Sequence, residues 1–166
     1  MPILDSSTLE FISRSPEQTR RLGLRLGNLL QNGDVICLVG DLGSGKTTLV
    51  QGISQGWGSL NPVSSPTFVL VNQYRNPEGR TLFHLDAYRL KDAIEAEDLD
   101  LNIMIDDGAL VVEWADRILP VLPPDNLTIQ MRWIADEQRS LILFPRGARY
   151  VQLLGEFRQR VLGGRT

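Results

Sequence analysis

The sequence predicts a three-layer α/β fold, in which a mainly parallel sheet with an antiparallel edge carries helices on both faces. Two observations lead to this class. Short apolar segments rich in β-branched residues alternate with segments whose leucines recur at helical spacing, which is typical of a sheet covered by helices. Towards the end of the chain the strand-like segments come closer together, and short connections favour antiparallel neighbours.

Size and composition limit the class of protein. The 166 residues suit one domain over residues 1–166, since domains run to roughly 100–200 residues. Cys37 is the single cysteine, which excludes a disulfide framework and a cysteine-based zinc site. The longest apolar run, Val35 to Val39, is far shorter than the roughly 20 residues that span a bilayer, and the N-terminus lacks the pattern of an export signal. We therefore expect a cytoplasmic protein that does not associate with membranes.

The first helix is predicted to begin at Pro16. Ser15 is a suitable N-cap, Pro16 fits the first helical position, and Gln18 completes a capping box. Leucines then recur at helical spacing until Asn32 and Gly33 favour a stop.

The remaining elements follow from short apolar segments and helical spacing. Strands are predicted at residues 35–39, 67–74, 81–86, 109–113, 126–133 and 140–144. The first is apolar throughout, as expected for a strand buried on both faces. Helices are predicted over residues 46–55 and over the amphipathic segment from Tyr150 to Val161, whereas residues 92–107 indicate short helix and loop.

A glycine-rich segment follows the first of these strands. Residues 40–47 match the pattern G-x-x-x-x-G-K-[ST] at every fixed position, and a predicted helix follows, as the pattern requires. Only two of the 17 basic residues are lysines, Lys46 and Lys91, so a lysine at the fixed position is less expected by chance. The candidate phosphate-binding residues are Gly40, Asp41, Leu42, Gly43, Ser44, Gly45, Lys46, Thr47 and Thr48. The fold is therefore predicted to be P-loop NTPase-like.

The residue types in this loop explain how it would bind phosphate. Its glycines let successive backbone N–H groups point inward, and the following helix presents its positive N-terminal end to the same anion. Lys46 can reach the β- and γ-phosphates, while the Thr47 hydroxyl can ligate Mg²⁺. Thr48 can add a hydroxyl near the α-phosphate.

Two acidic residues end neighbouring predicted strands. Asp86 follows residues 81–85 and Glu113 follows residues 109–112, and ligands of open α/β sheets bind outside such carboxyl ends. One acid could hold Mg²⁺, directly or through water, while the other orients the attacking water. Position alone does not assign these roles, and either carboxylate could instead cap nearby N–H groups.

Three further features lie near the candidate site. The hydroxyl-rich segment around Thr67 could sense a γ-phosphate, as nucleotide-dependent switch segments do, although it also suits an ordinary turn. His84 is the single histidine, and we favour a packing or supporting role for it over that of a general base. Trp114 directly follows Glu113 and is therefore a candidate site residue.

These motifs, in this order, resemble the TsaE (YjeE) family of small bacterial P-loop ATPases. They are Gly40–Thr48, Ser65-Pro66-Thr67-Phe68, His84-Leu85-Asp86-Ala87-Tyr88-Arg89-Leu90 and Glu113-Trp114. The P-loop alone is generic, but the three later motifs at these spacings are much more specific.

The resemblance implies an ATPase that uses ATP and Mg²⁺ and supports threonylcarbamoyladenosine formation in tRNA. It would act with a TsaB–TsaD pair, which transfers the threonylcarbamoyl group to the adenosine beside the anticodon, and it would reach tRNA only indirectly. By the same resemblance, Lys46 and Thr47 bind phosphate and Mg²⁺, and Thr67 belongs to a switch-like loop. Asp86 is then the Walker B-type acid, Glu113 a metal-linked or catalytic acid, and Trp114 a residue of the active site.

Three other functions remain open on the sequence. A small-molecule P-loop kinase would need an acceptor pocket and an arginine-bearing lid, for which residues 92–107 are long enough. A GTPase switch would need a guanine-selecting loop, which the two lysines do not supply. A binding module would use ATP without hydrolysing it.

The charge of the chain bears on its partners. The net charge is -3, and an acidic chain is a poor autonomous binder of DNA or RNA because phosphate neutralisation supplies most of such affinity. Residues 92–107 carry only acids among their charged residues, and residues 132–166 carry an excess of arginine. We interpret both segments mainly as solvent-exposed faces, and the alternative is that they are contact surfaces for a partner.

Overall fold

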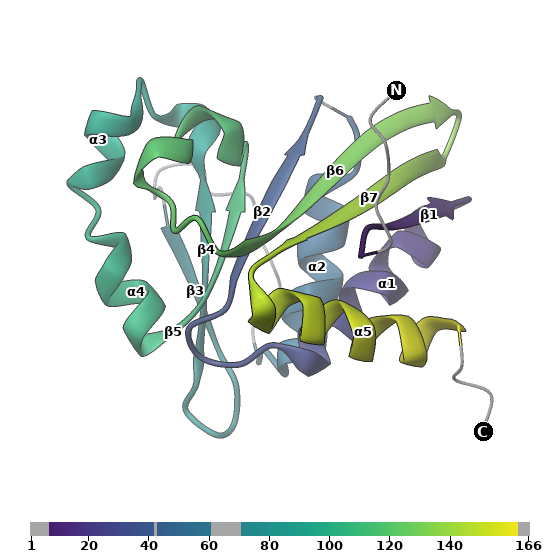
Figure 1. Cartoon of the computed structure of the whole chain (residues 1–166), viewed down its shortest axis with the longest axis horizontal. Helices are drawn as coiled ribbons and strands as arrows, with labels where there is room; N and C mark the ends of the chain where they lie inside the picture. The colour runs from purple at the N-terminus through teal and green to yellow at the C-terminus, as the bar shows by residue number, and fades with distance from the viewer. Residues whose placement is uncertain (1–6, 42, 61–70, 163–166) are drawn as a thin grey trace.

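The computed structural model describes residues 7–41, 43–60 and 71–162, and within them a seven-stranded sheet carries helices on both faces (Figure 1). The strands are β1 (Leu9–Ser13), β2 (Val35–Gly40), β3 (Val71–Arg75), β4 (Thr81–Asp86), β5 (Gly108–Glu113), β6 (Asn126–Ala135) and β7 (Gln138–Arg146). The α-helices are α1 (Pro16–Leu29), α2 (Lys46–Trp57), α3 (Ala93–Glu97), α4 (Leu101–Asp107) and α5 (Ala148–Leu162). Three short 3₁₀ helices are η1 (Ala87–Arg89), η2 (Ala115–Arg117) and η3 (Leu119–Val121).

The strand order is β1-β7-β6-β2-β5-β4-β3. The four central strands β6, β2, β5 and β4 run parallel, whereas β1, β7 and β3 join as antiparallel strands at the two sides. The predicted α/β class with parallel central strands is confirmed. The difference is that antiparallel strands flank both sides, because the tight connection between β3 and β4 also forms a hairpin.

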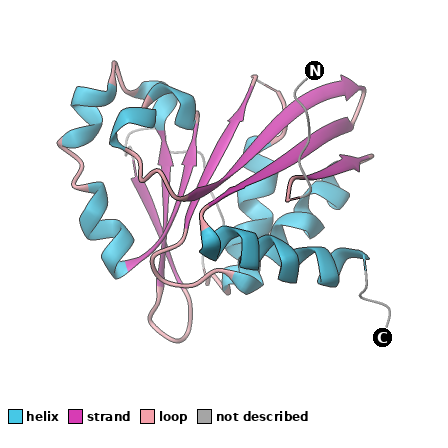
Figure 2. Ribbon diagram, in the orientation of Figure 1, coloured by secondary structure: helices cyan, strands magenta, loops and turns pink. Residues whose placement is uncertain are grey.

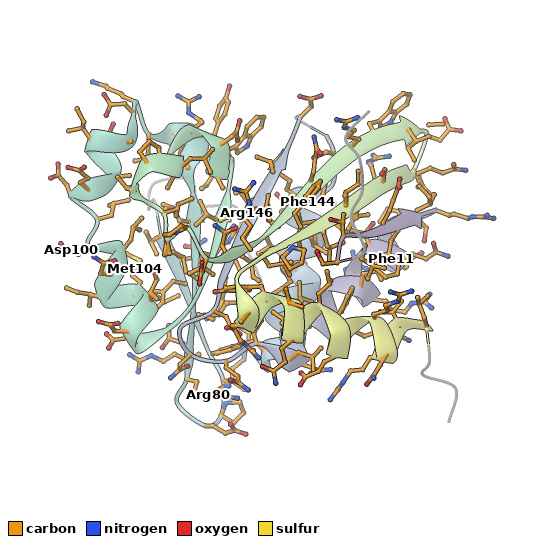
Figure 3. All side chains as sticks on the ribbon, viewed as in Figure 1. Phe11, Arg80, Asp100, Met104, Phe144 and Arg146 are labelled. Carbon is orange, nitrogen blue, oxygen red and sulfur yellow. The ribbon has the colours of Figure 1, made fainter. Side chains whose placement is uncertain are left out.

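Helices lie on both sides of the sheet (Figure 2). The central strands separate two apolar cores, and their residues alternate between them. In β2, Ile36 and Leu38 face the core formed with α1, α2 and α5, while Val35 and Cys37 face the core formed with α3, α4 and the 3₁₀ helices. Strands that are buried on both faces read as continuous apolar runs, which is why β2 and β5 could be predicted. In Figure 3, Asp100 and Met104 lie on the α3–α4 side of the molecule, and Phe11 lies at the other end with β1.

Strand β1 was not predicted from the sequence. It is a five-residue edge strand that pairs only with β7, and Ile12 is half exposed. Such a strand has too few buried residues to give a clear alternation, and its position is fixed by pairing with residues about 130 positions later, Leu9 with Leu143 and Ser13 with Arg139. Strands β6 and β7 also extend beyond their predicted ends, because their ladder continues after the apolar alternation stops.

The predicted start of α1 at Pro16 and the Ser15 N-cap are confirmed. The Gln18 backbone N–H donates to Ser15 Oγ at 3.2 Å, and the Arg14 N–H donates to Gln18 Oε1 at 2.8 Å. The first bond is the predicted Ser15 cap, whereas the second bonds Gln18 to the N–H of Arg14, one residue before the N-cap, and not to the Ser15 N–H as in a capping box. Pro16 occupies the first helical position.

Helices α1 and α2 touch each other through their backbones. The contact is made by two glycine pairs, Gly23 and Gly27 on α1 with Gly52 and Gly56 on α2. A Cβ at Gly27 would lie 2.1 Å from the Ile53 carbonyl oxygen, and every one of the four added Cβ atoms would lie within 2.4 Å of a backbone oxygen. No larger residue fits, so these glycines fix the distance between the helices.

Helix α5 is anchored to the turn that leads into β2. The Arg149 guanidinium donates to both oxygens of the buried Asp34 carboxylate, at 2.9 and 2.7 Å, and to the Leu29 carbonyl at 3.2 Å. The neighbouring Tyr150 hydroxyl accepts the Val35 N–H at 2.9 Å. A bidentate arginine pair of this kind fixes geometry as well as charge, and the hydrogen bond to Asp34 raises the pKa of Arg149.

Cys37 lies in β2 with its side chain fully buried. Burial raises the pKa of its thiol to about 12, so the residue is a core side chain and not a nucleophile.

Within the described residues, no helix is both long and apolar enough to cross a membrane.

We predict that Gly27→Ala destabilises the protein by about 1–3 kcal/mol, because the added methyl group forces α1 away from α2. Gly155→Ala on α5 is the matched control, since no atom of the described residues lies within 4 Å of the added Cβ. The control should be neutral or stabilising by up to about 1 kcal/mol, the helix propensity difference between the two residues. Urea denaturation measures both, and equal effects would refute the close helix contact.

Candidate nucleotide-binding site

The loop between β2 and α2 has the backbone that a phosphate-binding loop requires. Gly40, Gly43 and Gly45 have positive φ angles of 151°, 81° and 99°. A Cβ at Gly40 would lie 2.3 Å from the Met131 carbonyl oxygen on the neighbouring strand β6, so glycine is required there for space as well as for φ. The loop begins at a strand end and closes into a helix, as its sequence pattern predicts.

Helix α2 begins directly at this loop. Its N-cap is Gly45, and no side chain caps its first turn, which also holds no acidic residue. The N-terminal N–H groups and the positive end of the helix dipole therefore remain directed at the loop, where an anion is stabilised.

Lys46 is buried, with 5% of the residue exposed. Its Nζ donates to the Gly40 and Asp41 carbonyls at 2.5 and 2.8 Å and to Ser44 Oγ at 3.2 Å. Desolvation lowers the pKa of Lys46. Four acids oppose this shift through their negative charge: Glu113 most strongly, then Asp41, Asp116 and Asp86. The lysine is thus held inside the loop by carbonyl oxygens and carboxylate charges.

Thr47, the residue after this lysine, is hydrogen-bonded to Glu113. Thr47 Oγ1 donates to Glu113 Oε1 at 3.3 Å. Glu113 ends the central strand β5, whose neighbours β2 and β4 place Leu38 and Asp86 beside it. A buried carboxylate at the carboxyl end of the sheet therefore faces the hydroxyl at the start of α2.

The other carboxylate oxygen of Glu113 has a different partner. Glu113 Oε2 lies 2.5 Å from His84 Nε2, and the His84 ring is completely buried on β4. His84 Nδ1 lies 3.2 Å from the Tyr74 hydroxyl on β3. The sequence assigned His84 a packing or supporting role, but nothing in it indicated Tyr74 as its neighbour.

Asp86 lies at the end of β4, level with Glu113 on β5. It is half-buried, and its Oδ1 accepts the Tyr88 N–H at 3.0 Å as the N-cap of η1. The structure thus places both predicted acids at one edge of the sheet but gives them different surroundings. Glu113 faces Thr47 directly, whereas Asp86 caps a turn and acts on Lys46 through its charge.

Trp114 covers Lys46. The Lys46 Nζ lies 4.0 Å from the centroid of the Trp114 ring, which is a cation–π contact. Tyr88 packs against the same ring at 5.0 Å, and the Arg117 guanidinium lies 5.5 Å from the Tyr88 ring. Trp114 has a φ of 58°, a left-handed conformation that is rare for an aromatic residue, so the backbone is strained at this point.

Several predicted residues remain to be placed. Thr48 lines a cavity of about 40 Å³ beside the loop, together with Pro16, Thr19, Gly45, Glu137 and Arg139. Thr67 and Leu42 lie outside the described residues. Sequence reasoning missed Arg139, whose Nε donates to the Gly43 carbonyl at 3.2 Å, because the β6–β7 hairpin brings it to the loop from 96 positions away.

The donor set fits a magnesium nucleotide. Mg²⁺ prefers hard oxygen ligands and takes few of them from the protein, which a threonine hydroxyl and a carboxylate provide. Thr47 Oγ1 and Glu113 Oε1 are such a pair, next to a lysine and an uncapped helix N-terminus that suit phosphate. The fold and this site define the chain as a P-loop NTPase-like α/β protein.

The particular family follows from comparison with known proteins. Residues 13–141 match the family "Threonylcarbamoyl adenosine biosynthesis protein TsaE", and the chain belongs to this family. It is 41% identical over 137 residues to a Streptomyces coelicolor protein called "tRNA threonylcarbamoyladenosine biosynthesis protein TsaE", covering 79% of this chain and 93% of the relative. An Aquifex aeolicus protein of the same name is 42% identical over 137 residues, covering 81% and 95%.

A solved structure shows the same fold. The crystal structure of Bacillus subtilis YdiB matches with a TM-score of 0.78 and 30% identity, covering 93% of this chain and 96% of that one. The family resemblance that the sequence motifs suggested is therefore confirmed.

We predict that Lys46 loses its proton at a lower pH in the folded protein than in the urea-unfolded chain, because burial lowers its pKa. Between the two pKa values the unfolded chain binds more protons, so the contribution of this group to the unfolding free energy increases as pH rises. Glu113→Gln should lower the pKa of Lys46 further. NMR of ¹³C-labelled lysine measures it, and Lys91→Arg identifies the signal. A folded pKa at or above the unfolded one would contradict the prediction.

Proposed function

We propose that the protein binds ATP with Mg²⁺ at the loop of residues 40–48, hydrolyses it, and through this cycle supports threonylcarbamoyladenosine formation in tRNA. The observation that carries the proposal is the Thr47–Glu113 pair beside the buried Lys46, at the point where β2, β5 and α2 meet. Membership of the TsaE family gives the chain its role in this tRNA modification.

Each residue of the site has a task in this proposal. Lys46 now binds carbonyl oxygens of its own loop, and it would exchange them for phosphate oxygens when nucleotide enters. Trp114 covers the lysine and limits the access of water, which strengthens its electrostatic interaction with phosphate. Thr47 would bind Mg²⁺, which when present neutralises charge on the phosphates.

The surroundings of the two acids favour different roles for them. Glu113 is buried, bonded to Thr47, and held from its other side, which suits the acid that is linked to the metal and the attacking water. Asp86 is half-buried and caps η1, which suits an outer carboxylate that acts through water or through its charge. We therefore assign Glu113 the larger contribution to hydrolysis.

The position of residues 92–107 favours an ATPase over a small-molecule kinase. These residues form α3 and α4, and Ala96 and Leu101 are packed into the core on the face of the sheet opposite to α2. They are therefore placed as a cover of the sheet and not as a lid over the loop. Most of their acidic residues point outward, exposed to solvent.

The partners in this proposal come from the family. We propose that the chain acts in the cytoplasm with a TsaB–TsaD type pair and meets tRNA only through that pair, without binding DNA. The exposed acids of α3 and α4 and the arginines of β6, β7 and α5 are the charged surfaces available for docking. The net charge of -3 supports a protein partner over direct binding to nucleic acid.

We predict that Lys46→Ala weakens ATP binding by roughly 10–100-fold, since a charge-assisted contact of about 1.5–3 kcal/mol is lost. Glu113→Gln should slow hydrolysis by at least tenfold and leave ATP affinity in EDTA within about threefold of wild type, because the carboxylate acts on metal and water. Nucleotide titration calorimetry and phosphate release measure the two effects.

The matched controls are Lys91→Ala, which removes the second lysine, and Glu97→Gln, which removes an exposed acid on α3. Both should behave as wild type. Unchanged turnover in Glu113→Gln would remove this acid from the site, and tighter binding of GTP than of ATP in competition would contradict the choice of nucleotide.

We predict that the chain captures a TsaB–TsaD pair from purified components more strongly with ATP than with ADP. Lys46→Ala should lose this difference between ATP and ADP, because the variant lacks the side chain that can reach the γ-phosphate. Lys91→Ala should keep the difference. Immobilised chain and quantified partner bands measure the effect. Capture that is the same with ATP, ADP and no nucleotide would refute coupling between the nucleotide and the partner.

A further inference from the structure

A line of polar groups, three of them buried, runs from the edge of the sheet to the candidate nucleotide loop. It begins at the Tyr74 hydroxyl on β3, continues through the His84 ring on β4 and the Glu113 carboxylate on β5, and ends at the Thr47 hydroxyl on α2. Tyr74, His84 and Glu113 are 3%, 0% and 5% exposed. Buried polar groups are costly unless they are hydrogen-bonded, so this line needs a physical reason.

The strand register explains how the groups meet. His84 faces the same side of the sheet as Asp86, and β4 and β5 run parallel with Asp86 level with Glu113. His84 therefore lies one pleat behind Glu113, in the direction away from the loop. Its Nε2 reaches Glu113 Oε2 at 2.5 Å, while the opposite oxygen, Oε1, faces Thr47 at 3.3 Å.

The contact between His84 and Glu113 gives the two carboxylate oxygens different roles. A carboxylate oxygen accepts hydrogen bonds, so His84 Nε2 donates and holds Oε2. With Oε2 held, the carboxylate cannot rotate about its last bond, and Oε1 stays directed at Thr47. The Tyr74 hydroxyl at 3.2 Å from His84 Nδ1 fixes the ring plane from the other side.

His84 is not placed to act on substrate itself. A general base must reach the proton that it removes, but this ring is completely buried and its Nε2 is engaged with Glu113. Its effect on a nucleotide can only pass through the carboxylate. Hydrogen bonds to the outer side of a metal-binding carboxylate orient that ligand and usually change metal affinity or activity by about 10–100-fold when lost.

We propose that His84 is a positioning residue for Glu113, and that Tyr74 fixes the His84 ring, so that Glu113 Oε1 stays aimed at the Thr47 hydroxyl and the metal that it would bind. This inference rests on the proposed function, since it needs a magnesium nucleotide at the loop. The role belongs to the hydrogen bonds of His84 and not to the volume of its side chain.

The experiment compares ATP affinity with Mg²⁺ and with EDTA in the full chain. In wild type, Mg²⁺ should tighten ATP binding. In His84→Leu, which keeps an apolar side chain in the core, that gain should fall by about tenfold or more, while affinity in EDTA stays within about threefold of wild type. His84→Gln keeps an N–H at the position of Nε2 and should recover part of the gain. Tyr74→Phe should lose less than His84→Leu.

The control is Phe83→Leu, a change of the adjacent buried residue on the opposite face of β4. It should keep the full Mg²⁺ gain even if it lowers the melting temperature as much as His84→Leu does. If His84→Leu cannot be purified folded, Tyr74→Phe decides the question, because it removes the hydroxyl next to His84 Nδ1: a reduced Mg²⁺ gain supports the proposal, and a wild-type gain overturns it.

Three failures can be told apart. A wild-type chain whose ATP affinity does not respond to Mg²⁺ would overturn the proposed function and this inference together. A wild-type chain that responds, with a His84→Leu variant that responds equally, would overturn only the role of His84. If His84→Leu and Phe83→Leu both lose the Mg²⁺ gain in ATP affinity, His84 is only a packing residue and the proposal is overturned.

Discussion

The backbone contact between α1 and α2 is the constraint on which the candidate nucleotide site depends. Because four glycines bring the two helices together with no side chain between them, the axis of α2 is fixed by carbonyl oxygens that cannot rearrange. Lys46 and Thr47 are the first residues of α2, so a shift of this helix would move both of them relative to β5. Side-chain packing can adapt to a small change, but a backbone contact cannot, and the site inherits this rigidity.

Glu113 is the point at which the rigid helix meets the sheet. Its carboxylate is buried between β2 and β4, faces Thr47 with one oxygen and is held by His84 with the other. A buried charge is costly unless it has hydrogen-bond partners, and here the partners come from β4 and from α2. The hydrogen bonds that stabilise the buried Glu113 carboxylate therefore also set the direction in which its oxygens point.

The parts of the site that could be predicted are those that local sequence specifies. The loop needs glycines at fixed spacing, and Asp86 and Glu113 stand at the ends of apolar segments that can be recognised as strands. The parts that could not be predicted depend on contacts between distant segments. Arg139 reaches the loop only through the β6–β7 hairpin, and Tyr74 meets His84 only because β3 pairs with β4.

The sequence by itself determined the α/β class, the position of the loop with its lysine and threonine, the two strand-end acids and the resemblance to the TsaE family. Each of these features depends on a short local pattern of residues. Only the tertiary structure decided that the two acids differ, with Glu113 buried against Thr47 and Asp86 capping a turn. It also decided that His84 holds Glu113. The physical reason is that burial and hydrogen-bond partners are properties of neighbours in space, which strand order and register supply and which no local pattern contains.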